Sequence, residues 1–81
     1  CEIEEFKLTN DLDRLKNYVK KHGKEADFSD AGGALLLATK VGGELKGNPI
    51  RKFTFSPGMI LIFLGSQSQL EAIREKLIDV L

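Results

Sequence analysis

The sequence predicts a small two-layer α+β domain with the order strand, helix, strands, helix, built on a mixed or antiparallel sheet. Three observations favour this fold. Residues 56–81 run from a Pro-Gly turn through the unbroken apolar segment 59–64 into an amphipathic helix. Residues 11–22 carry apolar side chains at helical spacing, and short apolar or alternating segments bounded by glycines lie between the two helices. At 81 residues the chain makes one domain at most.

A strand over residues 2–8 and a helix over residues 11–22 are predicted for the N-terminal part. Charged and apolar side chains alternate at the end of the first segment, as expected of a half-buried strand. Thr9, Asn10 and Asp11 are suitable helix caps, and Gly23 is a suitable C-terminal stop. The apolar stripe of this helix consists of Leu12, Leu15, Tyr18 and Val19.

The middle of the chain predicts a loop, a strand and a tight hairpin. Residues 24–33 are mostly polar, and we expect a loop or short irregular element there, held in place by Phe28. Residues 34–38 are apolar on both faces and lead through Thr39 and Lys40 to Val41, which predicts a central strand. Gly42-Gly43 is a hairpin signal that leads into a short strand over residues 44–46.

Two further strands and a helix complete the prediction. Residues 50–55 alternate as a strand with one buried face, and Ser56-Pro57-Gly58 suits a type I or type II turn. Residues 59–64 contain no polar side chain, which predicts a strand covered on both faces. A capping box made by Ser66 with Gln69, or by Ser68 with Glu71, starts the last helix. Its apolar face consists of Leu70, Ile73, Leu77 and Leu81, flanked by Ala72 and Ile78.

Charge and hydropathy exclude several partners. Twelve basic and twelve acidic residues give no formal net charge, and neither half of the chain has the one-signed field that nucleic acid attracts. We therefore expect no nucleic-acid partner. The longest apolar run has six residues, whereas a helix needs about 20 to cross a bilayer.

The sequence offers no catalytic or metal-binding constellation. The single histidine, His22, follows lysines at a predicted helix C-terminus, where a cation opposes the helix dipole. The acidic residues near the N-terminus have spacings unlike those of a calcium loop. The segment 31–34 resembles a phosphate loop only in its glycines, because a strand rather than a helix is predicted to follow it. We expect no enzyme activity and no metal site, and the sequence identifies no cofactor.

The only cysteine, Cys1, stands at the first position, and the chain begins without methionine. One cysteine cannot form an intrachain disulfide. We expect the 81 residues to be one domain of a longer protein.

Residues 34–77 carry a pattern that resembles a known family. The pattern consists of Leu36 to Lys40, a Gly-Gly turn, Asn48-Pro49, a Phe-x-Phe strand, Pro57-Gly58, Ile60 to Leu64, Gly65-Ser66 and Leu70. It resembles the TrkA C-terminal domain, also known as the C-terminal subdomain of the regulator of potassium conductance. Met59 stands where that family usually has aspartate, and residues 23–33 are additional length.

The resemblance implies a regulatory domain of a potassium channel, potassium-uptake system or cation antiporter, on the cytoplasmic side of the membrane. In that family the domain forms homodimers and carries a ligand pocket at or near the dimer interface, for a nucleotide-type ligand or a cation. A plain dimerisation or assembly module with the same fold and no ligand is the alternative function.

Carried over position by position, the resemblance suggests six ligand-side residues. Leu36, Ala38 and Lys40 lie on the predicted central strand, and Asn48, Pro49 and Arg51 lie on the loop after it. Ordinary core and turn roles are the alternative for all six.

Overall fold

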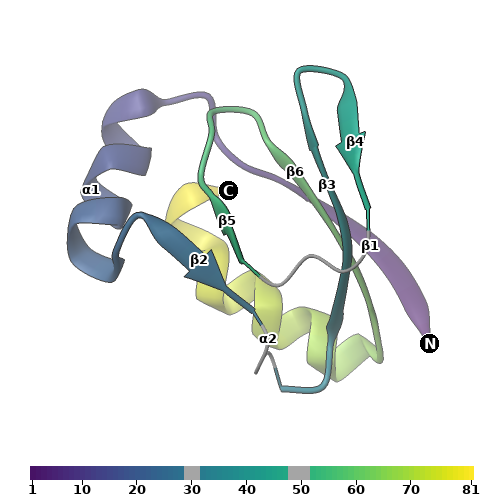
Figure 1. Ribbon diagram of the computed structural model, residues 1–81. Helices are drawn as coiled ribbons and strands as arrows, with labels where there is room; N and C mark the ends of the chain where they lie inside the picture. The colour runs from purple at the N-terminus through teal and green to yellow at the C-terminus, as the bar shows by residue number, and fades with distance from the viewer. Residues whose placement is uncertain (29–31, 48–51) are drawn as a thin grey trace.

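The computed structural model describes residues 1–28, 32–47 and 52–81 (Figure 1). The chain forms, in order, β1 (Glu2–Lys7), α1 (Leu12–His22), β2 (Glu25–Asp27), β3 (Leu35–Val41), β4 (Glu44–Lys46), β5 (Lys52–Thr54), β6 (Ile60–Gly65), α2 (Gln67–Leu77) and a 3-10 turn, η1 (Ile78–Val80).

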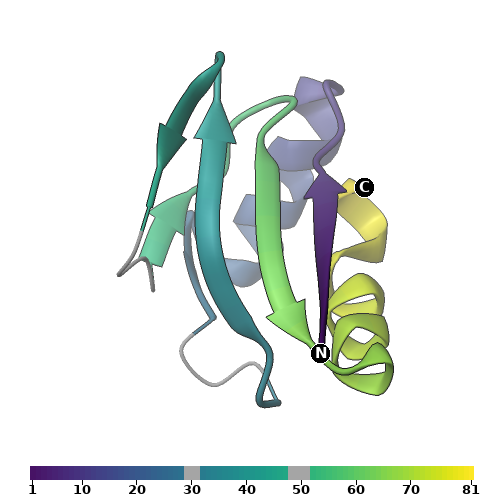
Figure 2. The same cartoon turned by 90° about the vertical axis from the view of Figure 1, so that its right-hand side faces the viewer.

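The strands form two antiparallel sheets. The larger has the order β1-β6-β3-β4, and β2 pairs with β5 in a separate two-stranded ribbon. Figure 2 shows the larger sheet with no helix in front of it, while α1 lies behind. The predicted α+β class and the order of strand, helix, strands and helix are confirmed, and every described strand pair is antiparallel.

One face of the larger sheet, which we call the inner face, packs against the rest of the molecule. Leu61 and Phe63 of β6 are fully buried there, beside Phe6 of β1 and Leu36 of β3. The two helices, η1, the ribbon and the connecting segments supply the remaining buried core residues, which are Leu8, Leu15, Tyr18, Ala26, Phe28, Ala34, Met59, Leu70, Ile73, Leu77 and Val80.

The other side of the sheet, the outer face, is not covered by any described segment. Ile60, Ile62 and Leu64 of β6 point to this face, because side chains alternate along a strand, and all three are only half-buried. The prediction that residues 59–64 are covered on both faces is therefore wrong. Both helices pack on the inner face, and in an antiparallel sheet the other face can stay open.

A β-bulge at Leu37 changes the phase of β3. Leu36 pairs with Phe63, but Ala38 pairs with Ile62, so one residue of β3 is extra. Beyond the bulge Thr39 shares the inner face with Leu61, and Lys40 shares the outer face with Ile60. The predicted hairpin at Gly42-Gly43 is present, and it leads into β4.

The β2–β5 ribbon differs from the prediction. Residues 25–27, expected in a loop, form a strand because they pair with β5. Of the strand expected over residues 50–55, only Lys52–Thr54 is observed among the described residues, and it belongs to the ribbon rather than to the main sheet. Phe28 is buried as expected and stacks on Phe53 with ring centroids 5.7 Å apart.

Helix α1 begins after Asp11, whose carboxylate accepts hydrogen bonds from the backbone N–H groups of Asp13 (3.0 Å) and Arg14 (3.3 Å). It ends at Gly23, which adopts a positive φ of 96°. Only Leu15 and Tyr18 of the predicted stripe are buried; Val19 is half-buried and Leu12 is exposed.

Helix α2 begins with the Ser66–Gln69 capping box. Gln69 N–H donates to the Ser66 hydroxyl (3.2 Å), and the Gln69 side chain accepts from Ser66 N–H (2.8 Å). The helix was expected to reach Leu81 but changes to a 3-10 turn after Leu77, which buries Val80.

The turn before β6 holds three distant segments together. Leu8 N–H donates to the Met59 carbonyl (2.7 Å), and Thr9 N–H donates to the Val80 carbonyl (2.6 Å). Gly58, at a positive φ of 70°, approaches Asn10 so closely that a β-carbon would lie 2.5 Å from its side-chain oxygen. The end of β1, the turn and η1 are thus fixed relative to one another.

The capping box predicts a specific loss of stability. Replacement S66A removes the acceptor for Gln69 N–H and should lower the free energy of unfolding by about 1 kcal/mol. Q67A, at an exposed position in the first turn of the same helix, is the matched control and should change it by less than about 0.5 kcal/mol. Urea denaturation measures both, and an equal loss in the two variants would contradict the assignment of Ser66 as the cap.

Candidate functional site

The structure separates the described residues of the sequence-predicted site. Leu36 is buried in the core on the inner face, whereas Ala38 and Lys40 are on the outer face because of the bulge at Leu37. These three residues therefore do not line one pocket. The other predicted residues, Asn48, Pro49 and Arg51, lie outside the described part of the chain.

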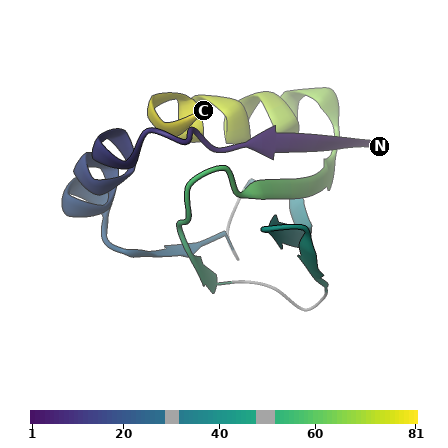
Figure 3. The same cartoon turned by 90° about the horizontal axis from the view of Figure 1, so that it is seen from above.

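A cavity of about 560 Å³ lies between the β3–β4 hairpin and β5, and we call it the cleft. Figure 3 shows β5 across from this hairpin when the molecule is seen from above. The volume is within the range of about 300–1,000 Å³ that is usual for small-molecule sites. The lining residues are Thr39, Val41, Glu44, Lys46, Gly47, Lys52, Phe53, Thr54, Ser56 and Met59.

Thr39 gives the cleft a buried hydroxyl group. The residue is only 2% exposed and is the one buried polar residue among those described. No hydrogen bond joins its hydroxyl to another described residue, and the group is not sealed away from solvent. Since buried polar groups are normally hydrogen-bonded, the Thr39 hydroxyl is available to a molecule in the cleft.

The charged residues of the cleft come from both sheets. Lys46 is the cross-strand partner of Thr39, and Glu44 is that of Val41, so both project from the inner face of the hairpin. Lys52 and Thr54 come from β5. The cleft therefore combines two lysines, one glutamate and three hydroxyl groups with the apolar side chains of Val41, Phe53 and Met59.

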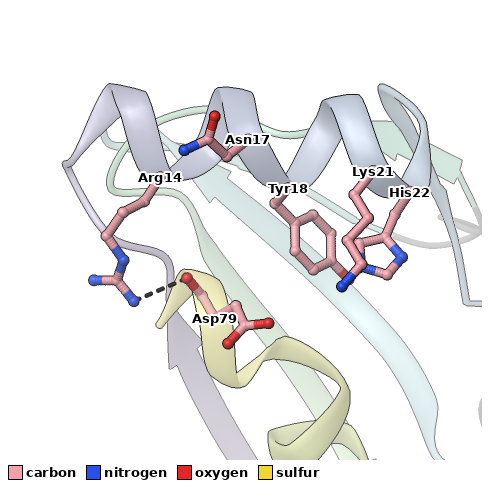
Figure 4. Close-up of a pocket in the computed structure, with 6 residues that line it drawn as sticks. All are labelled: Arg14, Asn17, Tyr18, Lys21, His22 and Asp79. Atoms are coloured by element: carbon pink, nitrogen blue, oxygen red, sulfur yellow. Dashed lines mark hydrogen bonds between the residues drawn. The ribbon is translucent and has the colours of Figure 1, made fainter.

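A second hollow, of about 220 Å³, lies between α1 and η1 and is lined by Arg14, Asn17, Tyr18, Lys21, His22 and Asp79 (Figure 4). The Arg14 guanidinium in this hollow already has partners within the chain, because it donates hydrogen bonds to the backbone carbonyls of Asp79 (2.8 Å) and Leu81 (3.3 Å). The Tyr18 hydroxyl likewise donates to the Lys76 carbonyl (3.4 Å). This region is better explained as the joint that fixes α1 to the C-terminal segment.

Tyr18 has an altered acidity in this joint. Burial raises the pKa of its hydroxyl above the ordinary value of 10.0, and the nearby Asp79 carboxylate raises it further. His22, at the end of α1, stacks against the same ring with centroids 4.4 Å apart.

The described residues contain no group of three or more His, Cys, Asp or Glu side chains that could hold a metal ion. In the same residues, no helix combines the length and apolar character needed to span a bilayer. Comparisons with models of known families, with curated proteins and with solved structures find no match to this chain.

Sequence reasoning missed the cleft, although part of the signal was present. Lys46-Gly47 and Lys52 flank, in the sequence, the loop that the resemblance singled out, and all three residues line the cleft. Thr39 could not be selected, because regular alternation from Leu36 places Thr39 on the opposite face. Only the bulge brings its hydroxyl to the cleft.

The Thr39 hydroxyl has no hydrogen-bond partner among the described residues but is still reached by solvent from the cleft, and this has a consequence for stability. T39V gives up only a bond to water, so it should change the free energy of unfolding by less than about 1 kcal/mol. T54V, at an exposed hydroxyl of the same cleft, is the control and should stay within about 0.5 kcal/mol. A loss larger than about 1 kcal/mol in T39V, measured by chemical denaturation, would show that the hydroxyl is satisfied in the fold.

Tyr18 is the only tyrosine, so tyrosinate absorbance reports on it alone. Because its pKa is raised in the folded state, the unfolded chain ionises first as the pH rises. The contribution to stability is complete below pH 10.0 and is lost as the pH passes through the raised folded pKa. Spectrophotometric titration should give a pKa above 10.0, and D79N should lower it; an unshifted wild-type pKa would contradict the burial of this hydroxyl.

Proposed function

We propose that this chain is a dimerising, ligand-sensing regulatory domain of a potassium channel or cation transporter, similar in role to the TrkA C-terminal domain. It acts on the cytoplasmic side of the membrane, as part of the transport protein or bound to it. The observation that carries this proposal is the uncovered, apolar outer face of the four-stranded sheet.

The outer face is apolar across neighbouring strands rather than at scattered positions. Cross-strand pairing places Ile3, Leu64 and Leu35 in one row across three strands. Ile3 is 65% exposed and Leu35 is 55% exposed. A second row contains Ile62 and Ala38, and in a third row Lys40 lies between Ile60 and Leu45. An exposed surface with this many apolar side chains on neighbouring strands is typical of an interaction site.

The charges on the outer face favour a second copy as the partner. Glu5 lies in the second row and Lys7 in the third, both on β1, and Lys40 of β3 also lies in the third row. A twofold axis that crosses the strands between these rows places Glu5 of each copy opposite Lys7 of the other. The same axis places Ile62 of each copy opposite Ile60 of the other.

A regulatory role needs a ligand that favours one arrangement of the two protomers over another. The cleft supports this part of the proposal, because it lies on the inner face and stays accessible when the outer faces meet. The alternative, an assembly module without a ligand, is supported by the outer face alone.

A thermal-shift screen separates these two functions. A ligand that binds only the folded domain raises its melting temperature, so nucleotides, cyclic dinucleotides and monovalent or divalent cations are suitable test compounds. A shift with any of them supports the regulatory role. A dimer that none of them stabilises would be an assembly module.

The outer-face dimer makes a direct prediction. The wild-type domain should sediment as a dimer at millimolar concentration. L35E should raise the dissociation constant about tenfold, because it places a carboxylate on the apolar outer face, and a tenfold change corresponds to about 1.4 kcal/mol. L12E is the matched control, because Leu12 is 50% exposed on α1, away from the outer face, and it should have no effect. A monomeric wild type, or equal effects of the two variants, would contradict the proposal.

Charge reversal tests the arrangement of the two copies. E5K should weaken the dimer by placing like charges together, and the double variant E5K/K7E should restore it. If the double variant is no stronger than E5K alone, the two residues do not face each other across the axis.

A further inference from the structure

We propose that the cleft between the β3–β4 hairpin and β5 binds a small organic anion, a phosphorylated or carboxylated molecule with an apolar body. Lys46, Lys52 and the Thr39 hydroxyl hold the anionic group. The inference deepens the proposed function, since it names a site and a ligand class for the sensing role, and it rests on the cleft rather than on the dimer.

The first step is the floor of the cleft. Thr39 is only 2% exposed, and its hydroxyl, which has no hydrogen-bond partner among the described residues, is the part of the residue that solvent still reaches. The hydroxyl therefore faces the cleft. A ligand oxygen that accepts a hydrogen bond from it takes the place of water.

The second step is the charge of the walls. Lys46 projects from β4 and Lys52 from β5, so cations from two separate sheets border one cavity. No ion pair joins either lysine to another described residue. Among the described residues of the lining, Glu44 is the one acidic residue beside two lysines, which leaves one positive charge in excess. That balance suits a compact monoanion or dianion better than a polyanion.

The third step is the size and composition of the cavity. At about 560 Å³ the cleft is much larger than one phosphate or carboxylate group. Val41, Phe53 and Met59 provide apolar surface beside the polar groups. The ligand therefore carries an apolar or ring-shaped body in addition to its anionic group.

Binding at this place has a structural consequence. The hairpin and β5 belong to different sheets, and an anion held by Lys46 and Lys52 joins the two. The ribbon that contains β5 packs on the core through Phe53 and Phe28. Occupation of the cleft thus stabilises the position of the ribbon relative to the main sheet.

Phenyl phosphate, benzoate and inorganic phosphate are the probes, with benzyl alcohol as the uncharged control. In ¹⁵N-resolved spectra of the full chain, phenyl phosphate or benzoate should shift the amide signals of Thr39, Lys46 and Thr54. The probe that binds more tightly shows whether the site prefers a phosphate or a carboxylate group. Inorganic phosphate should bind more weakly than phenyl phosphate, and benzyl alcohol should not shift these signals.

Variants then test the assigned roles. K46M and K52M should each weaken binding about tenfold, the range expected for a charge-assisted hydrogen bond. K40M is the matched control, because Lys40 follows Thr39 on the same strand and faces the other way; it should bind as the wild type does. T39V should weaken binding about fivefold without loss of stability, which separates a ligand contact from a structural role.

Three results would overturn the site: no shift with either organic anion, shifts spread outside the cleft, or the same loss in K40M as in K46M. The titration is repeated with L35E, where binding should persist in the monomer. Loss of binding there would overturn an intrachain site. If the wild type binds anions but is a monomer, the anion site is supported and the outer-face dimer is rejected. If the wild type is a dimer but binds no probe, the dimer is supported and the anion site is rejected.

Discussion

The structure depends on a chain of ring contacts that joins all six aromatic residues of the protein. Phe6 meets Phe63 edge-on, Phe63 meets Phe28, Phe28 stacks on Phe53, and the chain continues through Phe55 to Tyr18. It starts on the edge strand of the main sheet, crosses to the ribbon and ends on α1. An 81-residue domain has little apolar surface to bury, and aromatic side chains supply the most per residue. Their shared cluster fixes the ribbon against the sheet and so determines the shape of the cleft beside it.

The packing of the helices and the ribbon on the inner face also explains why no described segment covers the outer face. Both helices, η1 and the ribbon compete for contact with the inner face, and no described segment is left for the other one. The result is a division of roles between the two faces: the inner face holds the fold together and forms the cleft, and the outer face is free for a partner. A ligand on one side and a protomer on the other are connected through a single layer of strands. This is the physical basis on which the proposed sensing and dimerisation can be coupled.

Much of the fold follows from local patterns in the sequence. The capping residue Ser66, the glycine turn before β4 and the helical spacing in 11–22 each act over a few residues, and their predictions are confirmed. What could not be predicted depends on pairing between distant segments. Residues 25–27 have no strand pattern of their own and become a strand only by pairing with β5. Likewise, an unbroken apolar run does not reveal whether a partner covers its second face, as Ile60, Ile62 and Leu64 show. For the candidate site, the faces of Leu36, Ala38 and Lys40 depend on the bulge in β3, an irregularity that periodicity does not show.

That irregularity, the bulge at Leu37, determines more than the local geometry of β3. Without the extra residue, Lys40 would project into the inner face and Thr39 would lie outside, since alternation continues from Leu36. One inserted position therefore assigns a cation to the outer face, where we propose a partner, and a hydroxyl to the inner face, where we propose a ligand. When such a domain diverges, the gain or loss of one residue at the bulge moves Thr39 and Lys40 each to the opposite face of the sheet in a single step. Substitutions alone would have to change each position separately.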